Sequence, residues 1–258
     1  MKKNVTILTV ILASLCACNE SSTPTDSDTL TTDTDSLTSE NVNSPAPELT
    51  SLIYGIDISK YQGDEVELLD KSTDSLGFVI CKGTEGNTYV DPDFETNWAT
   101  IEEKGFIRGV YHFYRSDDDP ETQSSNFLSI LGDLDATNFS PMVDVEGGGI
   151  DASQSVETVQ NDLLSFLQII EEKTGRTPII YTDVSEGDKY FSSDAFAKYP
   201  LWIADYSGEE EPRMPGVWAN TEWTLWQKMD DYLIGSVEND FDVFNGSLVE
   251  LQKFIKNY

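Results

Sequence analysis

The sequence is poor in the residues that metal sites, disulfide frameworks and histidine-based hydrolases require. Its 258 residues include three cysteines and a single histidine, His112. Clusters of histidine and cysteine suited to zinc are therefore missing, and no glycine-rich phosphate loop with its lysine is present. A serine or cysteine hydrolase would have to use His112, yet no Gly-x-Ser-x-Gly motif accompanies it. We interpret His112 as structural or site-lining, and we expect neither a metal nor another cofactor.

Basic residues are also scarce. The chain has 16 lysines and arginines against 47 aspartates and glutamates, a formal net charge of −31. Nucleic-acid binding depends on basic side chains that neutralise phosphates, and attachment to an anionic membrane surface needs a basic patch. The acidity argues against both, so neither nucleic acid nor an anionic lipid surface is an expected partner.

The apolar run near the start of the chain, Val5 to Leu15, is shorter than the roughly 20 residues that a membrane span needs. It follows two lysines, which is typical of a signal peptide over residues 1–18. The next residues, Leu-Cys-Ala-Cys, resemble the bacterial lipobox, in which the signal is removed and the cysteine, here Cys18, becomes the lipidated first residue. An ordinary secretory signal cut near Ala17 is the alternative. We favour the lipoprotein, because leucine and alanine stand at the expected places before Cys18.

Residues 19–50 are rich in serine, threonine and acidic residues and contain no lysine, arginine or aromatic residue. Such a segment cannot bury enough apolar surface to order itself, so we predict a disordered acidic tether. It would hold a folded domain, residues 51–258, away from the lipid on Cys18. The expected location is the cell envelope, on a bacterial membrane, either periplasmic or surface-exposed. Processing at Cys18 would leave Cys81 as the remaining cysteine, so no internal disulfide is expected.

From residue 51 onward, apolar segments alternate with helical patterns. Predicted helices begin at Asp91–Pro92 and at Asp119–Pro120, and another covers 155–174. Apolar strands separated by helices indicate a parallel sheet with covered faces. Eight strands and about five helices fit a single α/β domain, an irregular (β/α) TIM-like barrel that loses its regularity in the last third. The strand candidates are 52–57, 77–82, 108–114, 140–146, 177–182, 200–205, 222–227 and 239–244.

The candidate catalytic residues are acids near the ends of these strands. Asp144 and Glu146 close the fourth strand before three glycines, Asp57 closes the first, and Asp240 lies in the eighth. Side chains two apart on a strand share one face, so the pair should face the barrel mouth. Neighbouring carboxylates raise each other's proton affinity, which suits a protonated glutamate beside an ionised aspartate for glycosidic bond cleavage. An isolated Asp-x-Glu could equally be a pair of solvent-exposed charges at a strand end. The position of Asp144 and Glu146 at the predicted barrel mouth favours a catalytic acid pair.

Aromatic residues gather near the same strand ends. Stacking on sugar rings is their expected use, and core packing is the alternative for those in mid-strand. The predicted substrate-binding residues are Tyr61, Tyr111, Tyr181, Tyr206 and Trp226.

Eight segments, in order, resemble the motif series of glycoside hydrolase family 25, the Chalaropsis-type lysozymes or N-acetylmuramidases. They span about residues 53–246 and read GIDISKYQG, FVICKGTEG, GVYHFYR, MVDVEGG, PIIYTD, LWIADYS, WTLWQ and DFDVFNG. The resemblance implies an irregular barrel of eight strands and five helices. It also implies hydrolysis of the β-1,4 bond between N-acetylmuramic acid and N-acetylglucosamine in peptidoglycan. In that case Glu146 is the proton donor and Asp144 its partner, with Asp57 in the cleft and Asp240 as the family's late aspartate.

The last segment departs from the family pattern, which is closer to Val-Asp-Leu-Asn, at Asn239 and Asp242. An acidic pair on one strand favours substrate-assisted retention, in which Asp144 holds the acetamido nitrogen; covalent retention is the alternative.

We expect a monomer whose partners are peptidoglycan glycan strands and, through Cys18, a membrane. Two rival functions stay open: an inactive glycan-binding protein on the same barrel, or another glycosidase such as a glucosaminidase or chitinase.

Overall fold

The computed structural model describes residues 52–258 of the chain. The predicted signal peptide (1–18), the lipidation site Cys18 and the predicted tether (19–50) lie outside the described residues. Within residues 52–258, no helix combines the length and the apolar character that crossing a bilayer requires.

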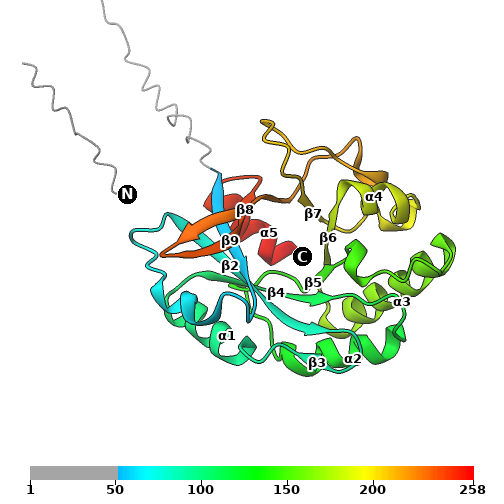
Figure 1. The fold of residues 1–258 in the computed structure, drawn as a ribbon, viewed down its shortest axis with the longest axis horizontal. Coiled ribbons are helices and arrows are strands. Elements are labelled where there is room, and N and C mark those ends of the chain that lie inside the picture. Colours follow the sequence, from blue (N-terminus) through cyan, green and yellow to red (C-terminus); the bar gives the residue numbers. More distant parts are fainter. Residues whose placement is uncertain (1–51) are drawn as a thin grey trace, which may run out of the picture. The chain divides into compact units, whose positions relative to one another are not determined.

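Eight strands form a closed ring (Figure 1). The ring runs in the order β1-β9-β8-β7-β6-β5-β4-β2, and β1 pairs in parallel with β2 to close it. A two-residue strand, β3 (Tyr89–Val90), pairs with the end of β2 and is not a member of the ring. The predicted eight-stranded α/β barrel is therefore confirmed. Its strands are β1 (Ile53–Ile58), β2 (Leu76–Glu85), β4 (Ile107–Phe113), β5 (Met142–Asp144), β6 (Ile179–Asp183), β7 (Leu201–Ala204), β8 (Leu225–Ile234) and β9 (Val237–Phe244).

The barrel is irregular in its last third, as predicted, because its final strand runs against the others. β8 and β9 form a hairpin whose turn contains Gly235 at a φ of +61°. So short a turn allows only antiparallel pairing, and β9 is accordingly antiparallel to both β8 and β1. The expected parallel sheet thus ends at β8. As a consequence, the middle of β9, rather than its carboxyl end, lies at the mouth of the barrel.

The described part contains five α-helices and four short 3-10 segments. The α-helices are α1 (Phe94–Glu103), α2 (Pro120–Leu131), α3 (Val156–Thr174), α4 (Val184–Tyr190) and α5 (Leu248–Asn257). The 3-10 segments are η1 (Gly63–Leu68), η2 (Gly147–Gly149), η3 (Asp194–Phe196) and η4 (Gly216–Trp218). The first strand is followed by η1 and the fifth α-helix follows the last strand, so the regular strand–helix alternation holds only for the middle of the chain.

Helix ends follow the local sequence signals. The side chains of Asp119 and Ser155 accept hydrogen bonds from first-turn N–H groups of α2 and α3, at 2.8 and 3.0 Å. Gly175 ends α3 in the left-handed conformation at a φ of +69°. Helix α1 begins at Phe94, later than predicted, because the buried Asp91 side chain holds the residues before it in a turn.

Alternate residues of the strands point inward and outward, which gives the barrel two apolar layers. The outer layer lies between the ring and the helices α1 to α4, which lie along the lower and right-hand sides of the molecule in Figure 1. The inner layer fills the ring, and α5 contributes Leu251 and Ile255 to it. The last residue of the chain bonds to Thr177, just before β6, which places α5 at the end where the parallel strands begin. The opposite end, where they finish, is the open mouth.

Candidate active site

A cavity of about 260 Å³ opens at the carboxyl ends of the parallel strands. All four predicted catalytic acids line it, as do three of the predicted substrate-binding tyrosines. The structure therefore brings side chains from all eight ring strands, and from the loops after β1 and β5, into one site. The lining consists of Asp57, Ile58, Ser59, Tyr61, Gln62, Lys82, Tyr111, Phe113, Asp144, Glu146, Tyr181, Trp202, Gln227 and Asp240.

Strand β5 and the residues after it place two acids on one side of the cavity. Asp144 ends the strand, and its carbonyl oxygen accepts a hydrogen bond from the Tyr114 N–H at 2.9 Å. The Val145 N–H donates to the Tyr181 carbonyl oxygen at 2.9 Å, and Glu146 keeps an extended backbone at φ −135° and ψ 166°. Because the chain is still extended there, Asp144 and Glu146 both reach the cavity, as their spacing predicts.

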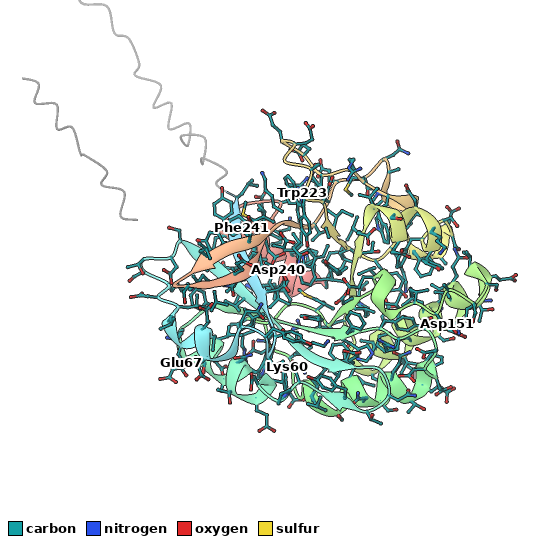
Figure 2. The ribbon with its side chains drawn as sticks, viewed as in Figure 1. Lys60, Glu67, Asp151, Trp223, Asp240 and Phe241 are labelled. Carbon is teal, nitrogen blue, oxygen red and sulfur yellow. The ribbon has the colours of Figure 1, made fainter. Side chains whose placement is uncertain are left out.

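The other two acids come from β1 and β9. Asp57 and Asp240 are direct neighbours across this antiparallel pair. Figure 2 shows Asp240 toward the middle of the molecule and Phe241, the next residue, toward the outside. The reversed direction of β9 is what brings Asp240 to the mouth from the middle of a strand. The rule that catalytic residues follow the carboxyl ends of barrel strands therefore holds for Asp57, Asp144 and Glu146, and not for Asp240.

Burial and mutual repulsion favour a proton on the Asp144–Glu146 pair. Asp144 is 8% exposed, and no donor among residues 52–258 bonds to its Oδ1. Burial raises the pKa of Asp144 well above its usual value, and the charge of Glu146 adds to this. Burial also raises the pKa of Glu146, with a further contribution from Asp183, while the Lys82 ammonium opposes both shifts. The pair thus keeps a proton at a pH where isolated carboxyl groups are ionised.

A hydrogen-bond network fixes the orientation of Asp57. The Gln227 side-chain N–H donates to Asp57 Oδ2 at 2.7 Å. Gln227 Oε1 in turn accepts from the Tyr181 hydroxyl at 2.8 Å and from the Tyr206 hydroxyl. Two tyrosines from β6 and the loop after β7 therefore set the orientation of the amide that holds Asp57.

Asp57 and Asp240 also have raised pKa values. For Asp57 burial is the main cause, and the charge of Asp240 adds to it. For Asp240, burial and then the charge of Asp230 raise the pKa to about 6. Both sides of the cavity therefore hold carboxyl groups whose pKa values are raised above the ordinary values of exposed acids.

The predicted aromatic residues divide into two groups. Tyr61, Tyr111 and Tyr181 line the cavity, and Tyr61 is 80% exposed at its rim. Tyr206 is half exposed and lines an adjoining hollow, joined to the cavity through its bond to Gln227. Three of the five predicted aromatic residues thus line the cavity, and Tyr206 adjoins it.

The structure does not bring Trp226 to the cavity. On β8 the flanking residues Leu225 and Gln227 point inward, so Trp226 points outward. Its side chain is 2% exposed and its indole N–H donates to the Asp205 carbonyl oxygen at 2.8 Å. The tryptophan that lines the cavity is Trp202, at an inward position of β7.

His112 lies outside the cavity, in the layer between the ring and its helices. It is fully buried between the rings of Phe127 and Phe166, with centroids 5.4 and 5.0 Å away. Its Nδ1 bonds with the Thr84 hydroxyl at 2.7 Å and its Nε2 with the Gln123 side-chain oxygen at 3.0 Å. Burial lowers its pKa to about 4, so His112 is a neutral structural residue.

The three glycines after Glu146 have different roles. Gly147 and Gly148 are exposed directly after the Asp144–Glu146 pair. Gly149 is buried, and a Cβ there would lie 2.1 Å from the Tyr114 carbonyl oxygen. Gly149 is therefore required for close packing of η2 on the end of β4, which holds Glu146 in place.

Sequence reasoning missed Lys82 and Gln227 as site residues. Both are polar residues at the last position of a predicted strand, and that signal would have found them. The Lys82 ammonium bonds to Glu85 at 2.8 Å and lies 4.6 Å from the centre of the Phe113 ring. Within residues 52–258 no group of three or more histidine, cysteine or acidic side chains is arranged to hold a metal ion.

A barrel whose mouth is lined by paired carboxyl groups and tyrosines is the arrangement of a glycoside hydrolase. The family model for glycosyl hydrolases family 25 matches residues 56–237, and the chain belongs to this family. The uncharacterized protein YegX of Escherichia coli (strain K12) is 32% identical over 212 residues, covering 79% of this chain and 73% of that protein. The N,O-diacetylmuramidase of Chalaropsis sp is 30% identical over 212 residues, covering 78% of this chain and 98% of that protein. The structure of a family GH25 lysozyme from Aspergillus fumigatus has a TM-score of 0.70 and 31% identity, covering 80% of this chain and 99% of that one.

Proposed function

We propose that this glycoside hydrolase is a lysozyme, an N-acetylmuramidase that hydrolyses the β-1,4 bond between N-acetylmuramic acid and N-acetylglucosamine in peptidoglycan. One observation carries the proposal: Asp144 and Glu146 stand together in the open end of the barrel, and burial raises the pKa of both. Relatives named as a lysozyme and as N,O-diacetylmuramidases support the choice of bond.

In the proposed mechanism Glu146 is the general acid. It gives its proton to the glycosidic oxygen while the acetamido oxygen of the muramic acid attacks the anomeric carbon, and the bond to the leaving sugar breaks. Asp144 accepts the acetamido N–H and stabilises the positive charge of the resulting ring. Water then attacks the anomeric carbon and gives a proton back to Glu146, while the bond between that carbon and the acetamido oxygen breaks and the acetamide is restored. Two displacements at the same carbon retain its configuration.

Substrate binding supplies the correct protonation state in this mechanism. Without substrate, the buried Asp144 competes with the half-buried Glu146 for the proton of the pair. Asp144 Oδ1 has no donor within residues 52–258, so it can accept one from the substrate. An N–H that donates to a carboxylate favours its ionised form. The acetamido N–H therefore moves the proton to Glu146, where the leaving group needs it.

Digestion of purified peptidoglycan tests the proposal. The wild-type protein is compared with Glu146→Gln and with Glu157→Gln, an exposed residue of α3 that serves as the matched control. Products are reduced with borohydride and identified by mass spectrometry. We expect new reducing-end muramic acid from wild type and control, and none from Glu146→Gln. Reducing-end glucosamine would assign the enzyme to a different bond, and binding without cleavage by wild type would indicate a glycan-binding protein.

We also propose that the enzyme is a monomer held in the cell envelope by a lipid on Cys18. The proposal is supported by the apolar run and the Leu-Cys-Ala-Cys sequence before residue 19, and by an active-site cavity built from one chain. Metabolic labelling with an alkyne fatty acid should mark wild type and not Cys18→Ala. Unlabelled wild-type protein in the soluble fraction would contradict the anchor, and a dimer mass in light scattering would contradict the monomer.

A further inference from the structure

One carboxyl group beneath the cavity has no part in the mechanism above. Asp242 lies on β9, two residues beyond Asp240 and toward the closed end of the ring. It is fully buried, and its register partners are Gly55 on β1 and Gln227 on β8. Gly55 cannot carry a side chain, because a Cβ there would lie 2.2 Å from the Phe78 ring. Asp242 is therefore enclosed on all sides by the barrel interior.

The hydrogen bonds of Asp242 do not suit an anion. Its Oδ1 accepts from the Trp202 indole N–H at 2.8 Å. No N–H or O–H group of residues 52–258 donates to its Oδ2, and no lysine or arginine of that part forms a salt bridge with it. A buried carboxylate with one neutral donor and no counter-charge is strongly disfavoured, so the group is a protonated acid.

A protonated Asp242 needs an acceptor, and Asp57 provides it. Both side chains point into the ring from neighbouring strands, and Gln227, the register partner of Asp242, bonds to Asp57. Each carboxyl group affects the pKa of the other, and a hydrogen bond between two carboxyl groups requires that one of them carries a proton. Asp242 is fully buried whereas Asp57 is 6% exposed at the cavity floor, which places the proton on Asp242. Asp57 then accepts from two sides, from Asp242 below and from the Gln227 amide at 2.7 Å.

We propose that Asp242 is a positioning residue that keeps its proton in the working enzyme and donates a hydrogen bond to Asp57, thereby favouring the ionised form of Asp57 and fixing its orientation under the substrate. This inference rests on the proposed function only for its activity measurements. It differs from a packing role, because an amide would serve equally well at this position whereas an isosteric apolar side chain would not.

The proposal predicts the pH behaviour of Asp57. A donor to an ionised carboxylate lowers its pKa, so loss of the Asp242 donor should raise the pKa of Asp57. The neighbouring donors are already engaged elsewhere: the Tyr181 and Tyr206 hydroxyls donate to Gln227, and Lys82 is bound to Glu85. The groups that face this part of the barrel are Asp57 on β1, Lys82 on β2, Tyr111 on β4, Asp144 and Glu146 at the end of β5, Tyr181 on β6, Trp202 on β7, Gln227 on β8 and Asp240 on β9.

The test compares Asp242→Asn, Asp242→Leu and the control Asp119→Asn, in which asparagine replaces an exposed helix cap that it serves equally well. We measure how kcat/KM depends on pH, and we expect Asp242→Asn to lose activity at the same acidic pH as the wild type. Asp242→Leu should lose activity at a pH higher by about one unit, a roughly tenfold loss of kcat/KM on the acid side. An unchanged pH dependence in Asp242→Leu, or equal losses in both variants, would overturn the inference.

A second measurement needs neither substrate nor variants that fold poorly. Carbon-13 NMR of the aspartate carboxyl groups should show Asp242 protonated in wild type from about pH 4 to about pH 7, above the ordinary aspartate pKa of about 3.9. Ionisation of Asp242 near that ordinary value would overturn the inference even if the enzyme cleaves peptidoglycan. If wild type does not cleave peptidoglycan, the proposed function fails, and this titration alone decides the role of Asp242.

Discussion

Replacing Asp240 with asparagine should make the protein more stable at neutral pH while it makes the enzyme less active. Burial and the charge of Asp230 raise the pKa of Asp240 to about 6, against about 3.9 in an unfolded chain. The folded state therefore holds this proton over a pH range in which the unfolded state has lost it. The free energy of unfolding falls as the pH rises above about 4, and the loss is complete once the pH has passed about 6.

The size of this effect follows from the difference between the two pKa values. Two pKa units correspond to about 3 kcal/mol, and because Asp240 is partly open to solvent at the mouth we reduce this to about 2 kcal/mol. Asp240→Asn should thus match wild type near pH 4 and exceed its melting temperature by about 4 to 8 °C near pH 7.5. The gain is expected because active-site acids are often held at a cost in stability.

Thermal unfolding followed by tryptophan fluorescence, at several pH values between about 4 and 8 that span the two pKa values, measures this directly. Asp231→Asn, an exposed acid of the same hairpin, is the matched control and should follow the wild-type curve. If Asp240→Asn and the wild type lose the same stability between about pH 4 and about pH 8, Asp240 is not the group that retains its proton in the folded state. Higher stability at pH 4 as well would point to packing instead of ionisation.

Three further predictions concern the parts that hold the site. Gly149→Ala should destabilise the protein by about 1 to 3 kcal/mol in urea unfolding, because its Cβ would meet the Tyr114 carbonyl oxygen at 2.1 Å; Gly147→Ala, which meets only a flexible glutamate end at 3.3 Å, should cost far less. Gln227→Leu removes the donor to Asp57 and should lower kcat/KM by roughly 10- to 100-fold with the fold intact; an unchanged kcat/KM would dismiss the network. Finally, de-N-acetylated peptidoglycan should be cleaved poorly, and equal rates on both polymers would rule out participation of the acetamido group.

The sequence predicted the barrel and the position of its acid pair because both depend on local periodicity. Apolar segments at regular spacing marked all eight strands, and the two-residue period of a strand placed Asp144 and Glu146 on one face. Asp57 followed from the same reasoning, since it ends the first predicted strand. These features need no knowledge of the tertiary structure, apart from the general rule that a parallel barrel opens at its carboxyl ends.

The features that were missed depend on the direction of a strand or on which face of the sheet is the inside. Gly235 and Ser236 form the hairpin turn, so β9 reverses and Asp240 reaches the mouth from mid-strand. Composition cannot tell an inward tryptophan from an outward one, and Trp202 lines the cavity whereas the predicted Trp226 packs in the outer layer. The network that joins Tyr206 to Asp57 through Gln227 crosses three elements far apart in sequence, so only the folded chain reveals it.

Joint action of Asp144 and Glu146 is the central claim of the mechanism, and a double-mutant comparison tests it most directly. Initial rates on purified peptidoglycan would be measured for wild type, Asp144→Asn, Glu146→Gln and the variant with both changes. If the two residues act as a unit, each single variant loses at least about 100-fold in kcat. The kcat of the double variant is then no lower than that of the less active single variant. Near-normal turnover by Asp144→Asn, or losses in the double variant that multiply, would contradict the mechanism.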